Sequence, residues 1–257
     1  MDVEATIMFT DCKGFTAMSE ELKDPRKISE TLIAYFTETS QHVLSNEGTI
    51  IKYIGDAVMA AWNAPLRQAD HALKGAMAAY QLHEASKIAV MGRTLTTRVG
   101  LATGEVLAGN LGSPYRFDYT CIGETTNFAA RLESLNKQLG TDILISDSTA
   151  KAIREQFVLR GLGHFVVAGK TQGVAIHELI GPLALKKEDL EWAEKFTAAI
   201  AEIRQGAFDK AKELFREVVW QRDGTDGPSE FYIKKIAELE KTGQLSEWTG
   251  MVRLTEK

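Results

Sequence analysis

The stretch ATIMFTDCKGFTAMS, residues 5–19, decides the interpretation of this chain, because its apolar run ends abruptly in a carboxylate, Asp11, with Gly14 soon after. A second stretch, TIIKYIGDAVMAAW, residues 49–62, places Asp56 after a glycine between two halves rich in β-forming residues. Glycine beside aspartate is typical of a tight turn, so the second stretch predicts a β-hairpin. An aspartate in such a position is, taken alone, most often only a turn residue.

Two such carboxylates together suggest a metal site. If the strand that ends at Asp11 neighbours the hairpin that carries Asp56, both side chains point to one edge of a sheet. Carboxylate oxygens suit one or two Mg²⁺ or Mn²⁺ ions, which commonly bridge the phosphates of a substrate. The backbone amides of residues 13–15 and the start of the following helix would add a turn that favours an anion. The sequence therefore predicts a metal and phosphate site at this edge.

The remainder of the first 181 residues shows mixed strand and helix patterns, which indicate an α/β or α+β domain. In chain order the patterns predict a helix within 24–48, a helix over 68–86, a strand over 96–112, a strand and then a helix over 117–140, and a strand, a helix and a hairpin over 141–181.

The character of the chain changes at Leu183, after which the pattern is almost wholly helical. The apolar spacing predicts three helices, and their arrangement resembles a tetratricopeptide-type helical hairpin. Because a single repeat of this kind does not fold alone, we expect it to pack on the domain before it. We predict two domains, 1–182 and 183–257.

Composition restricts the classes of protein to consider. The chain has 257 residues, of which 44% are hydrophobic and 25% are charged, as expected for a globular protein. Its net charge of −5 gives no excess of basic residues that would favour a nucleic-acid partner. Its two cysteines, Cys12 and Cys121, lie in dissimilar segments and predict free thiols in a reducing compartment. No apolar run is long enough to span a membrane. The free thiols lead us to expect a cytoplasmic location.

Four segments, taken together, carry a family resemblance. FTDCKGFT, IKYIGDAVMAAW, RVGLATGEVLAGNLGSPYRFDYTCIGETTNFAARLESL and VVAGKTQGVAIHEL resemble the catalytic domain of class III nucleotidyl cyclases, the adenylyl and guanylyl cyclases, over residues 3–180. The resemblance implies an α+β fold with ferredoxin-like βαββαβ topology, followed here by a helical extension. It also implies cyclisation of a nucleoside triphosphate with release of pyrophosphate.

The resemblance assigns the metal and phosphate site. It implies that Asp11 and Asp56 bind two Mg²⁺ or Mn²⁺ ions, and that the backbone carbonyl of Cys12 assists where the family usually has isoleucine. It further implies that the backbone at Gly14 and Phe15 contacts the triphosphate. Near the last hairpin the family often has Lys-Gly-Lys, whereas this chain has Ala168-Gly169-Lys170, so only Lys170 remains as a candidate triphosphate contact.

The resemblance also implies that two further residues recognise the base of the nucleotide. Lys52 occupies the position that is lysine in adenylyl and glutamate in guanylyl cyclases, and a lysine donates to an acceptor on the adenine edge. Thr120 resembles the threonine of a bacterial-type subclass, which includes bicarbonate-responsive enzymes. A hydroxyl both donates and accepts, so Thr120 discriminates less sharply than Lys52. Together they favour ATP as the substrate.

Asn127 and Arg131 match the family's transition-state residues. Their spacing of four places them on one face of the helix after Gly123, while Phe128 and Leu132 turn toward the core. Such a pair is, taken alone, more often a solvated helix face. The family pattern instead implies that the amide orients the ribose and that the guanidinium meets charge on the α-phosphate.

The family builds each site from two protomers, with the metal aspartates on one and the base-reading and transition-state residues on the other. This chain carries both sets, so we expect a homodimer with two composite sites that bind ATP. We also expect an upstream sensor or membrane domain missing from this chain, which would then be the cytoplasmic part of a longer protein. The rival interpretations are a guanylyl or dual-specificity cyclase, a non-catalytic nucleotide-binding cyclase domain, and a generic two-metal nucleotidyltransferase.

Overall fold

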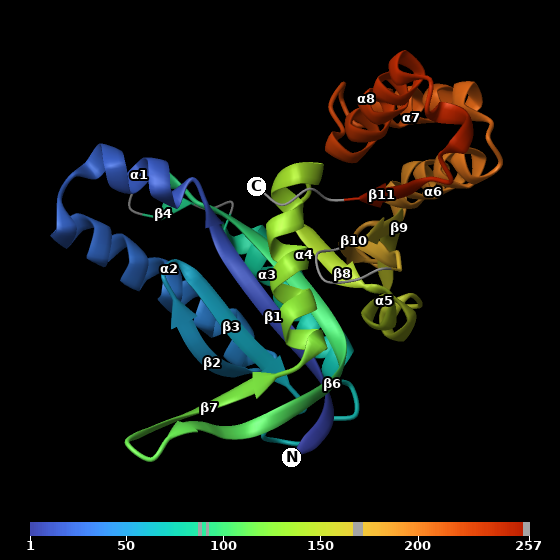
Figure 1. Ribbon diagram of the computed structural model, residues 1–257. Helices are drawn as coiled ribbons and strands as arrows, with labels where there is room; N and C mark the ends of the chain where they lie inside the picture. The colour runs from blue at the N-terminus through green and yellow to red at the C-terminus, as the bar shows by residue number, and fades with distance from the viewer. Residues whose placement is uncertain (87–88, 91–92, 167–171, 254–257) are drawn as a thin grey trace. The chain divides into compact units, whose positions relative to one another are not determined.

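The computed structural model describes the chain in two compact units, Met1–Asn136 with Asp142–Ile153, and Lys137–Thr141 with Arg154–Lys257. The described residues are 1–86, 89–90, 93–166 and 172–253 (Figure 1).

The first unit is built on a sheet with the strand order β8-β6-β1-β3-β2, to which β7 adds on the second half of β6. Its strands are β1 (Asp2–Lys13), β2 (Thr49–Ile54), β3 (Ala57–Trp62), β6 (Thr96–Ser113), β7 (Arg116–Ile122) and β8 (Ile143–Ser146). Neighbours are antiparallel except β6 and β8, which are parallel. A separate two-stranded ladder joins β4 (Ala89–Val90) to β5 (Arg93–Thr94).

Helices connect these strands and cover both faces of the sheet. They are α1 (Phe15–Leu22), α2 (Pro25–Ser45), α3 (His71–Ser86), α4 (Glu124–Leu139) and α5 (Asp147–Ile153). The order β1-α2-β2-β3-α3-β6, with β6 and β3 flanking β1 in the sheet, is the predicted βαββαβ arrangement and confirms the α+β fold.

Glycines set how closely two of these helices approach the sheet. Gly75 of α3 lies against Thr6 and Leu101, and Gly100 of β6 lies against the backbone of α4. Because neighbouring residues of a strand point to opposite faces, α3 and α4 cover opposite sides of the sheet. Figure 1 shows this arrangement, with α4 in front of β1 and α3 behind it. The α4 helix is thereby fixed on β6.

Local sequence explains where the longest helix begins. The side chain of Asp24 accepts a hydrogen bond from the backbone N–H of Arg26 at 3.0 Å, and Pro25 occupies the first turn of α2. Both features are typical of a helix N-terminus. The sequence missed that the segment before this cap is itself a helix, α1, which begins after Gly14.

The second unit combines two strands of a hairpin with the helices that follow. Its elements are β9 (Phe157–Val166), β10 (Val174–Pro182), η1 (Lys187–Asp189), α6 (Leu190–Arg204), α7 (Phe208–Gln221), α8 (Gly227–Thr242), η2 (Leu245–Glu247) and β11 (Met251–Arg253). The three predicted helices are confirmed. They pack on the preceding strands, as expected, since Tyr232 of α8 donates to the carbonyl of Leu162 at 2.6 Å.

The strand β11, which runs parallel to β9, was not predicted, because three residues are too few to show a period. The compact units group β9 and β10 with the C-terminal helices, so their division does not coincide with residue 182. The predicted domain boundary after residue 182 stays a prediction. Within the described ranges, every helix is too short or too polar to cross a lipid bilayer.

Candidate active site

The structure brings Asp11 and Asp56 together. Asp11 lies near the end of β1, and Asp56 lies in the turn between β2 and β3, where Gly55 has a φ of +63°. β1 pairs with β3 up to Thr10 opposite Val58, so the turn follows directly beside Asp11. Burial and the neighbouring Asp11 carboxylate raise the pKa of Asp56. The two carboxylates therefore repel one another at one edge of the sheet, as the sequence predicted.

This donor set fits a divalent cation. Two adjacent carboxylates present hard oxygen ligands, and a cation between them would remove their mutual repulsion. In the part of the chain that the structure describes, no three acidic, histidine or cysteine side chains form a cage. Magnesium is commonly held by one or two carboxylates together with substrate phosphates, so a third side-chain ligand is not required.

Two charged residues that the sequence analysis missed join this pair. Arg98 faces Asp11 across the β1–β6 ladder, with 3.5 Å between its Nη1 atom and the Asp11 Oδ2 atom. Glu133 of α4 has a pKa raised to about 7, first by burial and then by the charge of Asp11. Only the strand register and the packing of α4 on β6 reveal them, since neither stands beside an aspartate in the sequence.

Cys12 lies beside the carboxylates, but its thiol faces the core. The side chain is buried with Met18, Tyr35 and Leu95. Burial, and then the charges of Asp56 and Asp11, raise the pKa of the thiol to about 12, so it stays protonated near neutral pH. A protonated thiol is a poor metal ligand, which leaves only the backbone carbonyl for the predicted metal contact.

Gly14 and Phe15 form the turn that leads from β1 into α1. Gly14 has a φ of +86° and precedes the helix without a side-chain cap. A positive φ is accessible to glycine at little cost, so this residue permits the sharp bend. Phe15 packs partly buried against the cluster that holds Cys12. Their contact with a triphosphate stays a prediction.

The two candidate base-reading residues lie on neighbouring strands of the first unit. Lys52 is on β2 and Thr120 is on β7, where Thr120 is buried and Cys121 follows it. Burial raises the pKa of Cys121, and the nearby ammonium of Lys52 partly offsets this. Lys52 therefore lies close to the strand that carries Thr120.

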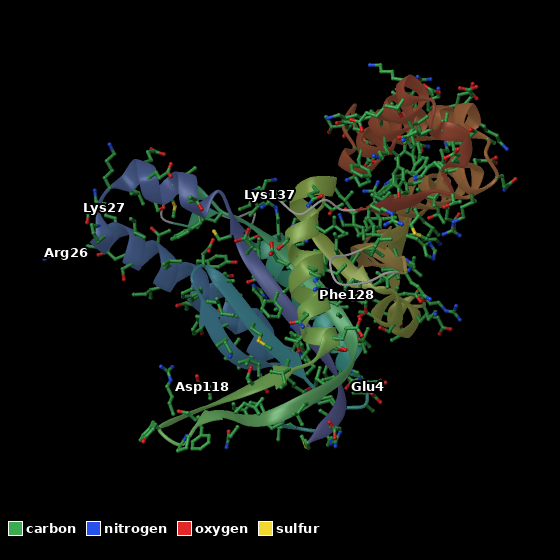
Figure 2. The ribbon with its side chains drawn as sticks, viewed as in Figure 1. Glu4, Arg26, Lys27, Asp118, Phe128 and Lys137 are labelled. Carbon is green, nitrogen blue, oxygen red and sulfur yellow. The ribbon has the colours of Figure 1, made fainter. Side chains whose placement is uncertain are left out.

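Asn127 and Arg131 lie on the first turns of α4. The backbone N–H of Asn127 donates to Gly123 at 3.2 Å, and the side chain of Asn127 is exposed while that of Arg131 is half-buried. Phe128 and Leu132 are buried, which confirms the predicted orientation of the helix. Phe128 is labelled on α4 in Figure 2. Among the described residues, no hydrogen bond or ion pair joins this pair to the two aspartates. The remaining candidate, Lys170, lies outside the described residues.

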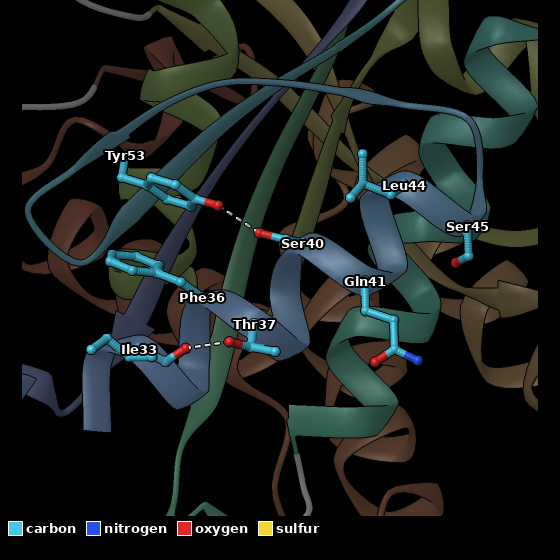
Figure 3. Close-up of a pocket in the computed structure, with 8 residues that line it drawn as sticks. All are labelled: Ile33, Phe36, Thr37, Ser40, Gln41, Leu44, Ser45 and Tyr53. Carbon is cyan, nitrogen blue, oxygen red and sulfur yellow. Dashed lines mark hydrogen bonds between the residues drawn. The ribbon is translucent and has the colours of Figure 1, made fainter. Parts of the chain in front are cut away.

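A groove elsewhere on this unit is separate from these residues. It has a volume of about 810 Å³ and runs along α2 beside Tyr53 of β2, whose hydroxyl lies 2.8 Å from the Ser40 hydroxyl (Figure 3). Its lining side chains are uncharged and include Ile33 and Leu44. Such a lining has no carboxylate to hold a metal ion and no cationic side chain to balance a triphosphate, so the carboxylate edge remains the candidate site.

A family model described as the adenylate and guanylate cyclase catalytic domain matches residues 2–181. Adenylate cyclase 1 of Rhizobium meliloti is 37% identical over 184 residues, which cover 69% of this chain and 28% of that protein. An adenylate cyclase of Anabaena cylindrica is 34% identical, and the match covers 68% of this chain and 36% of the relative. The chain thus spans only about a third of the length of these relatives.

Another relative extends over the helical tail. The terminal-differentiation specific adenylate cyclase of Dictyostelium discoideum is 28% identical over 255 residues, which cover 94% of this chain and 12% of that protein.

Solved structures agree with this assignment. The adenylyl cyclase CyaB from P. aeruginosa has a TM-score of 0.61 and 31% identity, and the match covers 70% of this chain and 95% of that structure. The guanylate cyclase domain of RhGC from Catenaria anguillulae, in complex with GTP, has a TM-score of 0.64 and 28% identity over 71% of this chain and 99% of that structure. The chain therefore belongs to the adenylate and guanylate cyclase catalytic domain family.

Proposed function

We propose that this chain is an adenylyl cyclase domain that converts ATP into 3′,5′-cyclic AMP and pyrophosphate. The observation that carries the proposal is the meeting of Asp11 and Asp56 at one sheet edge, with Arg98 opposite Asp11. Family membership and relatives named adenylate cyclase support it. The reaction is an in-line attack of the ribose 3′-oxygen on the α-phosphorus, so the protein positions the triphosphate and stabilises charge.

Asp11 and Asp56, with the backbone carbonyl of Cys12, would hold two Mg²⁺ or Mn²⁺ ions. When bound, these ions acidify the ribose hydroxyl and offset the charge of the phosphates. The backbone amides at Gly14 and Phe15 bind phosphate oxygens at the start of α1. Lys170 remains a lower-ranked candidate for the triphosphate, since Ala168 replaces the other lysine that the family often has.

Lys52 and Thr120 select the base. The Lys52 ammonium can only donate, so it matches an acceptor on the adenine edge, and Thr120 supplies a hydroxyl that donates or accepts. The freedom of that hydroxyl favours one second candidate, a cyclase that also accepts GTP. Similarity to a guanylate cyclase domain in complex with GTP is consistent with this alternative.

The active assembly is a homodimer with composite sites. Asp11 and Asp56 lie on one set of elements, whereas Asn127 and Arg131 lie on α4, and no described contact joins the two pairs. A second protomer would place its Arg131 against the α-phosphate, where a planar fork of donors meets the developing charge. Its Asn127 would orient the ribose. A cytoplasmic location and an upstream sensor or membrane domain stay predictions.

The experiment is chromatographic product analysis of the purified chain with ATP or GTP, each with Mg²⁺ and with Mn²⁺. We expect cyclic AMP from ATP, and none from a matched Asp56→Ala protein. Cyclic GMP as the main product would overturn the role given to Lys52. A linear product would indicate a nucleotidyltransferase, and nucleotide binding without turnover would indicate a regulatory cyclase domain.

A further inference from the structure

Three hydroxyl groups form a buried cluster beside the carboxylate edge. They belong to Thr10 of β1, Tyr35 of α2 and Thr97 of β6, whose side chains are all buried. The Thr97 hydroxyl donates to the Tyr35 hydroxyl, with 3.4 Å between the two oxygen atoms. Burial raises the pKa of the Tyr35 phenol, and side-chain hydrogen bonds with Thr97 and Thr10 oppose that rise. We call Thr10, Tyr35 and Thr97 the hydroxyl cluster.

Thr10 joins the strand that carries Asp11 to the turn that carries Asp56. Its Oγ1 atom accepts a hydrogen bond from the backbone N–H of Val58 at 3.1 Å. Thr10 and Val58 are also the last residues that face each other in the β1–β3 ladder. The Thr10 side chain therefore holds the base of the turn against the end of β1 at the point where the pairing of the two strands stops.

The hydroxyl cluster and the charged side chains lie on opposite faces of the sheet. Successive residues of a strand point to opposite faces, so Asp11 points away from Thr10. Thr10 shares its face with Cys12, which is buried in the core. The same alternation separates Arg98 from the Thr97 side chain. The cluster therefore lies behind the candidate site and not in it.

Each charged side chain at the carboxylate edge stands one or two residues from a position that the cluster holds. The neighbours are Thr10 and Asp11, Thr97 and Arg98, and Val58 and Asp56. Each residue adds only two soft dihedral angles, so a backbone fixed at one member of a pair limits the movement of the other. The Asp11 charge raises the pKa of Asp56, which shows that the two carboxylates repel each other. A tie between their segments opposes that repulsion.

We propose that Thr10 is a positioning residue which, supported by Tyr35, sets the spacing of Asp11 and Asp56 for metal binding. Its hydroxyl keeps the turn that carries Asp56 against the end of β1, so the two carboxylates stand ready to share a cation. Thr10 itself touches neither substrate nor metal. This inference rests on the proposed cyclase function and on the metal role given there to the two aspartates.

The first test is steady-state kinetics of Thr10→Val, which replaces the hydroxyl with a methyl group of similar size. We expect kcat to fall at least about tenfold while KM for ATP changes less than about threefold, because misplaced catalytic groups slow the chemical step. Thr10→Ser keeps the acceptor oxygen for Val58 and should keep at least about half of the original kcat. An unchanged kcat in folded Thr10→Val, or an equal loss in Thr10→Ser, would overturn the inference.

Thr149→Val is the matched control for loss of a buried hydroxyl in the same unit. The Thr149 hydroxyl is buried and donates to the Thr103 hydroxyl at 2.9 Å. Thr103 faces Thr6, which lies roughly 16 Å before Asp11 along β1. We expect Thr149→Val to lose stability but to keep the original kcat. An equal loss of kcat in Thr149→Val and Thr10→Val would mean a merely structural role for Thr10.

Amide hydrogen exchange in the metal-free protein tests the tie without any turnover. The Val58 amide should exchange at least about tenfold faster in Thr10→Val than in the unchanged chain, because its acceptor is lost and the turn opens locally. The Leu101 amide, in the middle of β6, corrects for any change in global stability. Equal protection of Val58 in the two proteins would show that Thr10 does not hold the turn.

Metal binding distinguishes failure of this inference from failure of the proposed function. If the unchanged chain forms no cyclic nucleotide, the proposed function fails, and electron paramagnetic resonance of Mn²⁺ then decides the positioning role. Thr10→Val should need at least about tenfold more Mn²⁺ for half-saturation than Thr149→Val, since residues that orient metal ligands contribute this much to affinity. Equal Mn²⁺ affinities would refute the role of Thr10.

Tyr35→Phe provides a second variant if Thr10→Val does not fold. It removes only the phenolic oxygen and keeps the ring that packs with Cys12 and Met18. We expect kcat to fall at least about threefold, with faster exchange of the Val58 amide, because Thr10 then loses its support. If neither quantity changes in Tyr35→Phe, the hydroxyl cluster does not position the aspartates.

Discussion

Two clusters of charge in this molecule contrast sharply. At the edge of the first sheet, Asp11 and Asp56 lie together with raised pKa for Asp56, and Arg98 approaches only one of them, at 3.5 Å. In the second unit, Arg160 is fully buried, yet every charge around it has a partner. A cluster with unbalanced charge is suited to a ligand, whereas a balanced and desolvated one holds a structure.

The largest expected effect is a loss of activity when the Asp11–Asp56 pair is changed. Asp56→Asn should reduce cyclic nucleotide formation by roughly three orders of magnitude, since metal-assisted stabilisation contributes several kcal/mol. The same change should leave the metal-free protein as stable or more stable, because it removes repulsion from Asp11. Initial rates and thermal unfolding in chelator measure the two effects. A strongly destabilised Asp56→Asn protein would place this carboxylate among the structural charges.

In the Arg160 cluster, by contrast, loss of a carboxylate should lower the stability of the protein. Asp226→Ala leaves the Arg160 guanidinium short of a buried partner, which should cost about 3–5 kcal/mol of unfolding free energy. Lys212→Ala, which breaks exposed ion pairs to Asp209 and Glu240, should cost less than about 1 kcal/mol. Urea unfolding of the two variants makes the comparison. Similar losses of unfolding free energy in both variants would mean that the buried Arg160 cluster stabilises the protein no more than exposed ion pairs do.

Base selection should show a smaller effect. Lys52→Glu replaces a donor with an acceptor, so the ratio of kcat/KM for ATP to that for GTP should fall about 10- to 100-fold. Lys27→Glu, at an exposed position on α2, is the control for a change of charge in the same unit. A ratio that moves equally in both variants would remove Lys52 from base selection.

The smallest expected effect concerns pH. The pKa of Glu133 is raised from 4.5 to about 7, so the folded protein binds this proton more tightly than the unfolded chain does. Stability of the metal-free protein should therefore fall as pH rises from about 4.5 to about 7. Glu133→Gln should flatten that part of the profile. An identical slope in Glu133→Gln would assign the proton to another group.

The sequence predicted the elements that the hydrophobic pattern and the turn residues of a short segment determine. The hairpin with Asp56, the helix that begins after Gly123 and the three helices of the tail each follow from residues close in the chain. The carboxylate pair was also predicted, because both aspartates interrupt strand patterns. Arg98 and Glu133 were missed since their relevance depends on strand register and on the packing of α4.

The Arg160 cluster was missed for a related reason. Arg160, Glu178 and Asp226 stand far apart in the sequence, and an arginine within a strand pattern reads as an exposed position. Only the fold shows that two aromatic rings and two carboxylates enclose it.

The measurement that tests the central claim most directly is complementation between two inactive chains, Asp56→Ala and Arg131→Ala. Random exchange of equal amounts should place half of the protein in mixed dimers, each with one intact site, so about a quarter of the original activity should return. Each chain alone stays inactive. No recovery, in a mixture shown by sedimentation to contain dimers, would contradict the shared site.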